Sequence, residues 1–131
     1  MPRKGGKRKK SRTHLGQSES IADDVPKSFV FKRGKVPAVV SELVADLRHV
    51  MEPFTARNLK ERKSNSIKDF IKVAAPLGIS HFAFFSSTKI NTNLKITRLP
   101  RGPTLSFQLN DFALMRHIRA TQKRPIDASV R

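Results

Sequence analysis

The sequence predicts a mixed α/β domain that follows a disordered, basic N-terminal tail. Short runs rich in phenylalanine and β-branched residues are typical of strands. Other segments carry apolar residues at helical spacing along one face. In chain order these segments read strand, helix, helix, strand, strand, strand, helix, and this mixture indicates the α/β class.

The tail is expected over residues 1–25. Nothing in this segment could bury enough apolar area to offset the entropy of ordering it. Its cations form a cluster without any acid between them: Arg3, Lys4, Lys7, Arg8, Lys9, Lys10 and Arg12. Such a cluster suits a nuclear or nucleolar address, an RNA-binding arm, or both. The alternative is a tail that only keeps the protein soluble.

The first strand is predicted over residues 28–31, an apolar run that ends before Gly34. A long amphipathic helix follows, because one face collects Val36, Val39, Val40, Leu43, Val44, Leu47, Val50 and Met51. Pro37 is tolerated in a first helical turn, and Pro53 closes the segment. A second helix is predicted over residues 67–75, with Pro76 and Gly78 ending it.

Three strands and a helix complete the predicted domain. Residues 81–85 are expected to form a buried strand, because apolar side chains fill both faces. A polar turn over 91–93 leads to strands over 94–99 and 104–109, whose alternation predicts one wet face each. A last helix is expected to begin at an Asn110 or Asp111 cap, with Phe112, Leu114, Met115 and Ile118 as its apolar positions. Residues 122–131 lack any period and are expected to be unstructured.

The charge of the chain points to a polyanionic partner. There are 27 Lys and Arg against 10 Asp and Glu, a net charge of +17, and such an excess favours nucleic acid through attraction and counterion release. A membrane partner is not expected, because no apolar run approaches the roughly 20 residues of a bilayer span. The sequence has no cysteine, which excludes disulfides, thiolate metal sites and a cysteine nucleophile and fits an intracellular address.

No constellation of catalytic residues stands out. The four histidines, His14, His49, His81 and His117, lack metal-ligand spacing. The glycines beside Lys7 and Lys35 lack the Walker spacing, and no serine lies in a nucleophile elbow. We therefore expect no enzyme activity, no metal, no cofactor and no small-molecule substrate.

Two basic segments are candidates for contact with RNA. The first carries Arg57, Lys60, Arg62, Lys63 and Lys68 around the single acid Glu61, and in a helix Arg57, Lys60 and Lys63 would share a face. An ordinary solvated surface is an equal alternative. The second is the proline-rich connection over 98–104, which would hold Arg98 and Arg101 in place to grip phosphates. A structural turn with incidental arginines explains it equally well.

Seven runs of the sequence, in their order and spacing, resemble the Brix domain family, and within it the Peter Pan group. They are residues 10–14, 25–35, 51–56, 59–63, 68–70, 75–78 and 98–105. Arg33 and Lys35 lie within these runs and join the expected RNA contacts. The resemblance covers about residues 10–121, whereas residues 126–131 match nothing. Ser64 and Ser66 also stand where relatives tend to be basic or polar.

The resemblance implies a nucleolar ribosome-assembly factor that binds pre-ribosomal RNA of the large subunit and pairs with a small rRNA-processing protein. The Brix fold has two similar α/β halves, which resemble anticodon-binding domains of certain tRNA synthetases. Residues 26–121 are then the N-terminal half of a truncated domain, and we expect exposed strand edge or apolar surface, with self-association as one result. The alternatives are a module that docks a protein and contacts RNA only through its tail, or a fragment without function.

Overall fold

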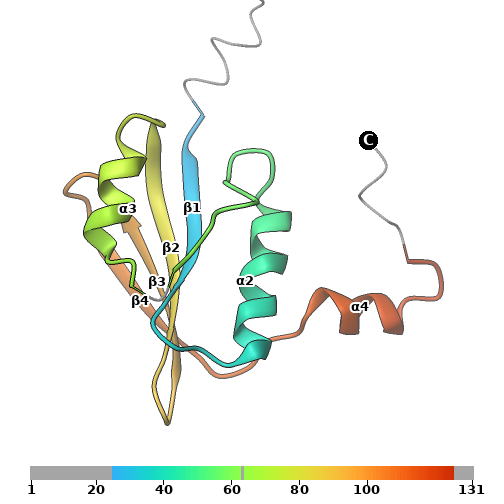
Figure 1. Ribbon diagram of the computed structural model, residues 1–131. Helices are drawn as coiled ribbons and strands as arrows, with labels where there is room; N and C mark the ends of the chain where they lie inside the picture. The colour runs from blue at the N-terminus through green and yellow to red at the C-terminus, as the bar shows by residue number, and fades with distance from the viewer. Residues whose placement is uncertain (1–24, 63, 126–131) are drawn as a thin grey trace, which may run out of the picture.

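The computed structural model describes residues 25–62 and 64–125, which form a four-stranded sheet with one helix packed on each face and a third helix set to one side (Figure 1). The predicted order of elements and the α/β class are confirmed. In chain order the elements are β1 (Lys27–Arg33), α2 (Ala38–Val50), α3 (Ile67–Ala74), β2 (Ile79–Ser87), β3 (Thr92–Arg98), β4 (Thr104–Leu109) and α4 (Met115–Thr121). None of the helices in these described residues is long and apolar enough to cross a membrane.

The sheet has the strand order β1-β2-β3-β4. β1 and β2 are parallel, with Phe31 opposite Phe84, so the chain needs the crossover through α2 and α3 to join them. β2, β3 and β4 then follow as antiparallel neighbours. β1 and β4 are consequently the two edge strands.

The core lies on both faces of β1 and β2. On one face Phe29, Phe31, Phe82 and Phe84 pack with Phe70 and Ala74 of α3. The rings of Phe31 and Phe70 are stacked with centroids 4.1 Å apart. On the other face Val30 and Phe85 pack with Val40 and Val44 of α2. Because successive side chains of a strand point to opposite faces, the continuous apolar runs of β1 and β2 contribute to both clusters, as was predicted for residues 81–85.

β3 and β4 have one polar and one apolar face, as the alternation predicted. Cross-strand pairing places Lys95 opposite Ser106 on one face, and Leu94 opposite Phe107 and Ile96 opposite Leu105 on the other. Leu94 and Leu109 pack against the α2 cluster. Farther along the apolar face, the side chains of Leu105 and Phe107 remain 55% and 47% exposed.

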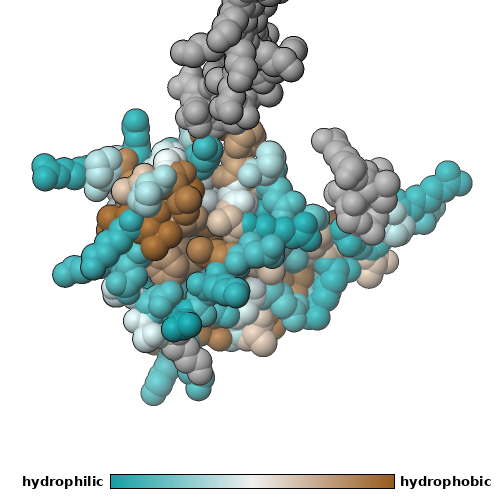
Figure 2. Space-filling model, turned by 45° about the horizontal axis from the view of Figure 1, so that its top comes forward, coloured by the Kyte–Doolittle hydropathy of each residue, from teal (hydrophilic) through white to brown (hydrophobic). Residues whose placement is uncertain are grey.

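A second apolar area reaches the surface on the side of α3, where Figure 2 shows hydrophobic side chains among hydrophilic ones. Ile71 and Val73 of α3, and Leu77 just after it, are 42%, 51% and 54% exposed. The helix thus buries Phe70 and Ala74 but presents apolar side chains to solvent as well.

Several predicted boundaries were wrong. α4 begins at Met115 with Leu114 as its N-cap, and neither Asn110 nor Asp111 caps it. Leu114 is 1% exposed, and the Met115 amide donates to Asp46 Oδ2 of α2 at 2.8 Å, so tertiary packing fixes the start of this helix. Thr92 and Asn93, expected in a turn, belong to β3, and Pro37 is the N-cap of α2 rather than part of its first turn.

Candidate nucleic-acid interface

Residues 54–61 run along the outer edge of β1. In this parallel strand Ser28 and Lys32 turn their backbone groups away from β2. The Ser28 amide donates to the Phe54 carbonyl at 2.8 Å, and Thr55 Oγ1 donates to the Ser28 carbonyl at 3.0 Å. Near the other end of the strand, the Lys32 amide donates to Glu61 Oε2 at 3.3 Å. The segment therefore covers this edge and is held along it.

A nearly buried ion pair fixes the same segment to α2. Arg48 Nη2 pairs with Glu61 Oε1, and the two side chains are only 12% and 9% exposed. Arg48 Nε donates to the Val30 carbonyl at 2.8 Å, and Nη1 donates to the Leu59 carbonyl at 3.3 Å. Every guanidinium nitrogen thus has a partner, as a cation in such surroundings needs. Arg62, the next residue in the chain after Glu61, is exposed.

Lys32, Arg48 and Glu61 were missed as site residues by the sequence reasoning. The one available signal was Glu61, the single acid in a run of cations. Nothing local marked Arg48, whose carbonyl and carboxylate partners lie 11 to 18 residues away along the chain.

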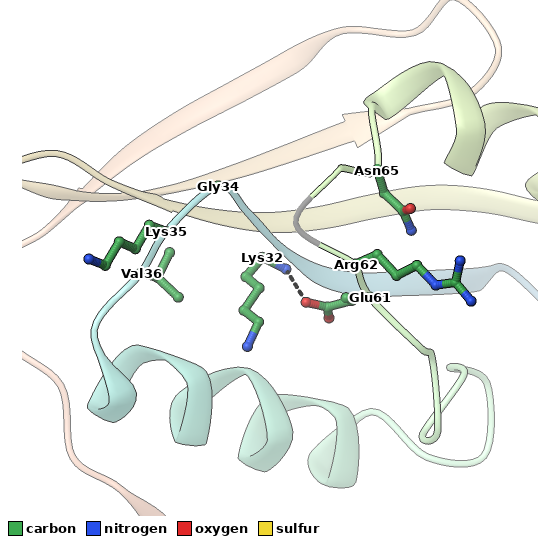
Figure 3. Close-up of a pocket in the computed structure, with 7 residues that line it drawn as sticks. All are labelled: Lys32, Gly34, Lys35, Val36, Glu61, Arg62 and Asn65. Carbon is green, nitrogen blue, oxygen red and sulfur yellow. Dashed lines mark hydrogen bonds between the residues drawn. The ribbon is translucent and has the colours of Figure 1, made fainter.

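A pocket of about 330 Å³ opens beside this anchor, where β1 ends (Figure 3). It is lined by Lys32, Gly34, Lys35, Val36, Glu61, Arg62 and Asn65. Gly34 has a φ of 74°, a left-handed conformation that glycine adopts without strain as the chain leaves the strand. The pocket thus gathers three cations around one acid, and that acid is already paired with Arg48.

The three cations do not converge on one point. Lys32 Nζ donates to Ser41 Oγ of α2 at 3.2 Å. Figure 3 shows the side chains of Lys35 and Arg62 extending toward opposite sides of the pocket, and both residues are exposed. A set of cations spread across a surface suits a row of phosphates along a nucleic-acid backbone better than a single small anion.

The residue next to Asn65 fixes the start of α3. Asp69 Oδ2 accepts hydrogen bonds from the Ser66 amide and the Ser66 hydroxyl, both at 2.9 Å. These bonds favour the charged carboxylate, the backbone bond most, and they lower the pKa of Asp69 below its ordinary value. Asn65, which lines the pocket, is thus joined directly to an anchored helix end.

The other cations of the first basic segment are not gathered at the pocket. Residues 57–62 and 64–66 form no helix, so the condition under which Arg57, Lys60 and Lys63 would share a face is not met in the described part of this segment. Arg57 Nε lies 3.1 Å from Glu52 Oε1, beside a separate pocket that Arg57, His49 and Arg119 help to line. Lys60 is exposed, as is Lys68 in the first turn of α3.

Arg98 and Arg101 lie at the other end of the sheet. Arg98 is opposite His81 near the start of β2, whereas Arg33 is opposite Ser86 near its end. The offset between these two positions along β2 is roughly 16 Å at about 3.3 Å per residue. The tight connection is confirmed, because the Gly102 amide donates to the Arg98 carbonyl at 3.0 Å. A Cβ on Gly102 would lie 2.4 Å from the Arg98 Cβ. Both arginines are exposed but do not join the pocket.

Arg33, at the end of β1, is exposed and adjoins the pocket residues Lys32 and Gly34. Lys63 and the tail cations Arg3, Lys4, Lys7, Arg8, Lys9, Lys10 and Arg12 lie outside the described residues. Within residues 25–62 and 64–125, no three His, Asp or Glu side chains come together in a way that could hold a metal ion.

The sequence matches a known family over most of its length. Residues 33–129 match the Brix domain, so the match extends past residue 121, where we expected the resemblance to end, and includes most of residues 126–131, which we expected to match nothing. The chain is 46% identical over 123 residues to a Brix domain-containing protein of Schizosaccharomyces pombe, covering 92% of this chain and 32% of that protein. It is 43% identical to the Peter Pan-like protein of Arabidopsis thaliana, covering 82% of this chain and 31% of the relative.

A third relative is the ribosome biogenesis protein SSF2 of Saccharomyces cerevisiae, 44% identical over 124 residues, with 91% of this chain and 27% of the relative covered. The chain therefore spans about a quarter to a third of the length of these curated relatives.

Proposed function

The chain belongs to the Brix domain family, and on that premise we propose that it acts in ribosome biogenesis as an RNA-binding protein without catalytic chemistry. Two relatives in Saccharomyces cerevisiae carry the name ribosome biogenesis protein. The RNA that we propose is the precursor of the large ribosomal subunit, and the place is the nucleolus. A small rRNA-processing protein, implied by the family resemblance, is the protein partner in this proposal.

The observation that carries the proposal is the set of cations held around the pocket at the end of β1. Lys35 and Arg62 are exposed there, while the one acid of the pocket, Glu61, is paired with Arg48. The exposed charge is therefore left for an outside anion. Contacts of this kind are made to phosphates, so binding should depend strongly on salt and weakly on base sequence. RNA shape would supply the specificity.

A salt titration of binding to structured ribosomal RNA tests this proposal. The variant Lys35→Ala/Arg62→Ala should bind more weakly, and the negative slope of log K against log salt should decrease in magnitude by up to about two, or about one for each lost phosphate contact. The matched control is Lys72→Ala/Lys123→Ala, which removes the same charge from exposed positions away from the pocket. This control should keep a slope nearer that of the parent chain.

Removal of residues 1–16 separates this proposal from its main rival. If the folded part contacts RNA, the shortened chain keeps a substantial salt slope, and the pocket variant lowers it further. Equal binding by the pocket variant and its control, together with complete loss of binding on removal of residues 1–16, would assign the RNA contact to the tail alone. The folded part would then be a protein-docking module.

A further inference from the structure

The two edges of the sheet differ sharply. The edge of β1 is covered, because its outward groups at Ser28 and Lys32 bond to Phe54, Thr55 and Glu61. β4 lies at the end of the strand order, and within the described part of the chain its hydrogen bonds to other backbone run only to β3. An uncovered edge strand is a template on which another strand can pair.

β4 also lacks the devices that normally protect such an edge. Its six residues, Thr104–Leu109, include no charged residue and no proline, although the chain as a whole carries a net charge of +17. Leu105 and Phe107 stand on one face, 55% and 47% exposed, and the other face carries Thr104, Ser106 and Gln108. A partner strand must match this pattern, apolar on one face and uncharged but polar on the other.

β4 itself has the required pattern, and we infer that the uncovered edge pairs with β4 of a second copy of this chain. A two-fold axis perpendicular to the sheet gives an antiparallel pair and keeps the apolar faces of both copies on one side. Centred on Phe107, the pairing sets Leu105 opposite Leu109 and Phe107 opposite its own copy. The Arg98 amide donates to the Pro103 carbonyl at 3.2 Å, so the backbone groups of Thr104, Ser106 and Gln108 point away from β3, and in this register Ser106 forms the hydrogen-bonded pair with Gln108 of the other copy.

The proposed register is also favourable in charge. The strand pair itself contains no charged residue, so no like charges face one another across it. Asp111 lies two residues past the end of β4, and in this register it comes beside the other copy's connection between β3 and β4, which carries Arg101. Both side chains are exposed. Opposite charges thus meet at each end of the pair.

The covered edge of β1 limits how far the association can go. The sheet of residues 25–62 and 64–125 offers one open edge, so two copies paired through it leave no free edge of this sheet for a third. The expected product is a dimer rather than an open-ended assembly.

Sedimentation equilibrium over a range of protein concentrations tests the inference. The parent chain should show a monomer–dimer equilibrium. Phe107→Lys and Phe107→Glu each place like charges directly opposite one another, which should raise the Kd of the dimer by more than about tenfold. An equimolar mixture of the two variants should dimerise again, because the lysine of one copy then faces the glutamate of the other. An unfolded variant could not recover in this way.

Val73→Lys is the control, because Val73 belongs to the other exposed apolar area, on α3. This variant should dimerise like the parent chain. A parent chain that stays monomeric at every accessible concentration would overturn the inference, as would open-ended assemblies. Dissociation by Val73→Lys instead of Phe107→Lys, or a mixture of the Phe107 variants that stays monomeric, would overturn it equally.

Discussion

At the scale of single residues, the ion pair between Arg48 and Glu61 has a positioning role. Taking two charges out of water costs free energy that their attraction barely offsets, so such a pair is weak evidence for stability. Its contacts instead join α2, the edge of β1 and residues 54–61. A surface loop that carries cations is thereby held in one geometry, which would lower the entropy lost in the proposed binding of RNA.

Loss of one partner of this pair should be costly. Arg48→Met leaves Glu61 without its cation and removes the donors to the Val30 and Leu59 carbonyls. We expect the free energy of unfolding in urea to fall by about 3 to 5 kcal/mol. Arg116→Met is the control, since its pair with Glu42 is 62% and 47% exposed and should contribute less than about 1 kcal/mol. Similar losses in both variants would contradict the role given to Arg48.

At the scale of elements, the features that depend on local sequence pattern could be predicted, and the features that depend on long-range contacts could not. The strands over β1, β2 and β4 were predicted because their apolar periods are visible within a few residues. The start of α4 was predicted wrongly because it depends on Asp46, 69 residues earlier in the chain. The path of residues 54–61 was beyond local reasoning for the same reason: Thr55 and Glu61 bond to β1, 27 to 29 residues away. Lys35 and Arg62 were named from the sequence as candidate RNA contacts, whereas Lys32 and the anchor formed by Arg48 and Glu61 were not.

The start of α3 should respond to pH through Asp69. Hydrogen bonds from Ser66 lower the pKa of this carboxyl in the folded protein, so its contribution to stability is present above its unfolded pKa and is lost as the pH falls through the lowered value. Asp69→Asn should therefore reduce the thermal midpoint near neutral pH, and the difference from the parent chain should shrink in acid. Thermal unfolding by circular dichroism at several pH values measures this. A difference independent of pH would argue against the assignment.

At the scale of the whole molecule, the net charge of +17 acts in opposite directions on the two proposed associations. Salt screens the attraction between the cations and RNA phosphates, and it equally screens the repulsion between two copies of this chain. RNA affinity should fall with added salt while dimerisation through β4 strengthens. Binding and sedimentation measured across one series of salt concentrations would show this, and a parallel response of both would contradict the division between the two surfaces.

The covered edge of β1 limits the valence of the molecule, meaning the number of partners that it can bind through sheet edges. A sheet with one open edge is monovalent, so two molecules terminate one another. Release of residues 54–61 would give the molecule a second open edge and make it divalent, and divalent units can grow into filaments without limit. The segment of residues 54–61 therefore also prevents the growth of filaments from the edge of β1. Substitutions that loosen it should be selected against even where they leave the surface charge of the protein unchanged.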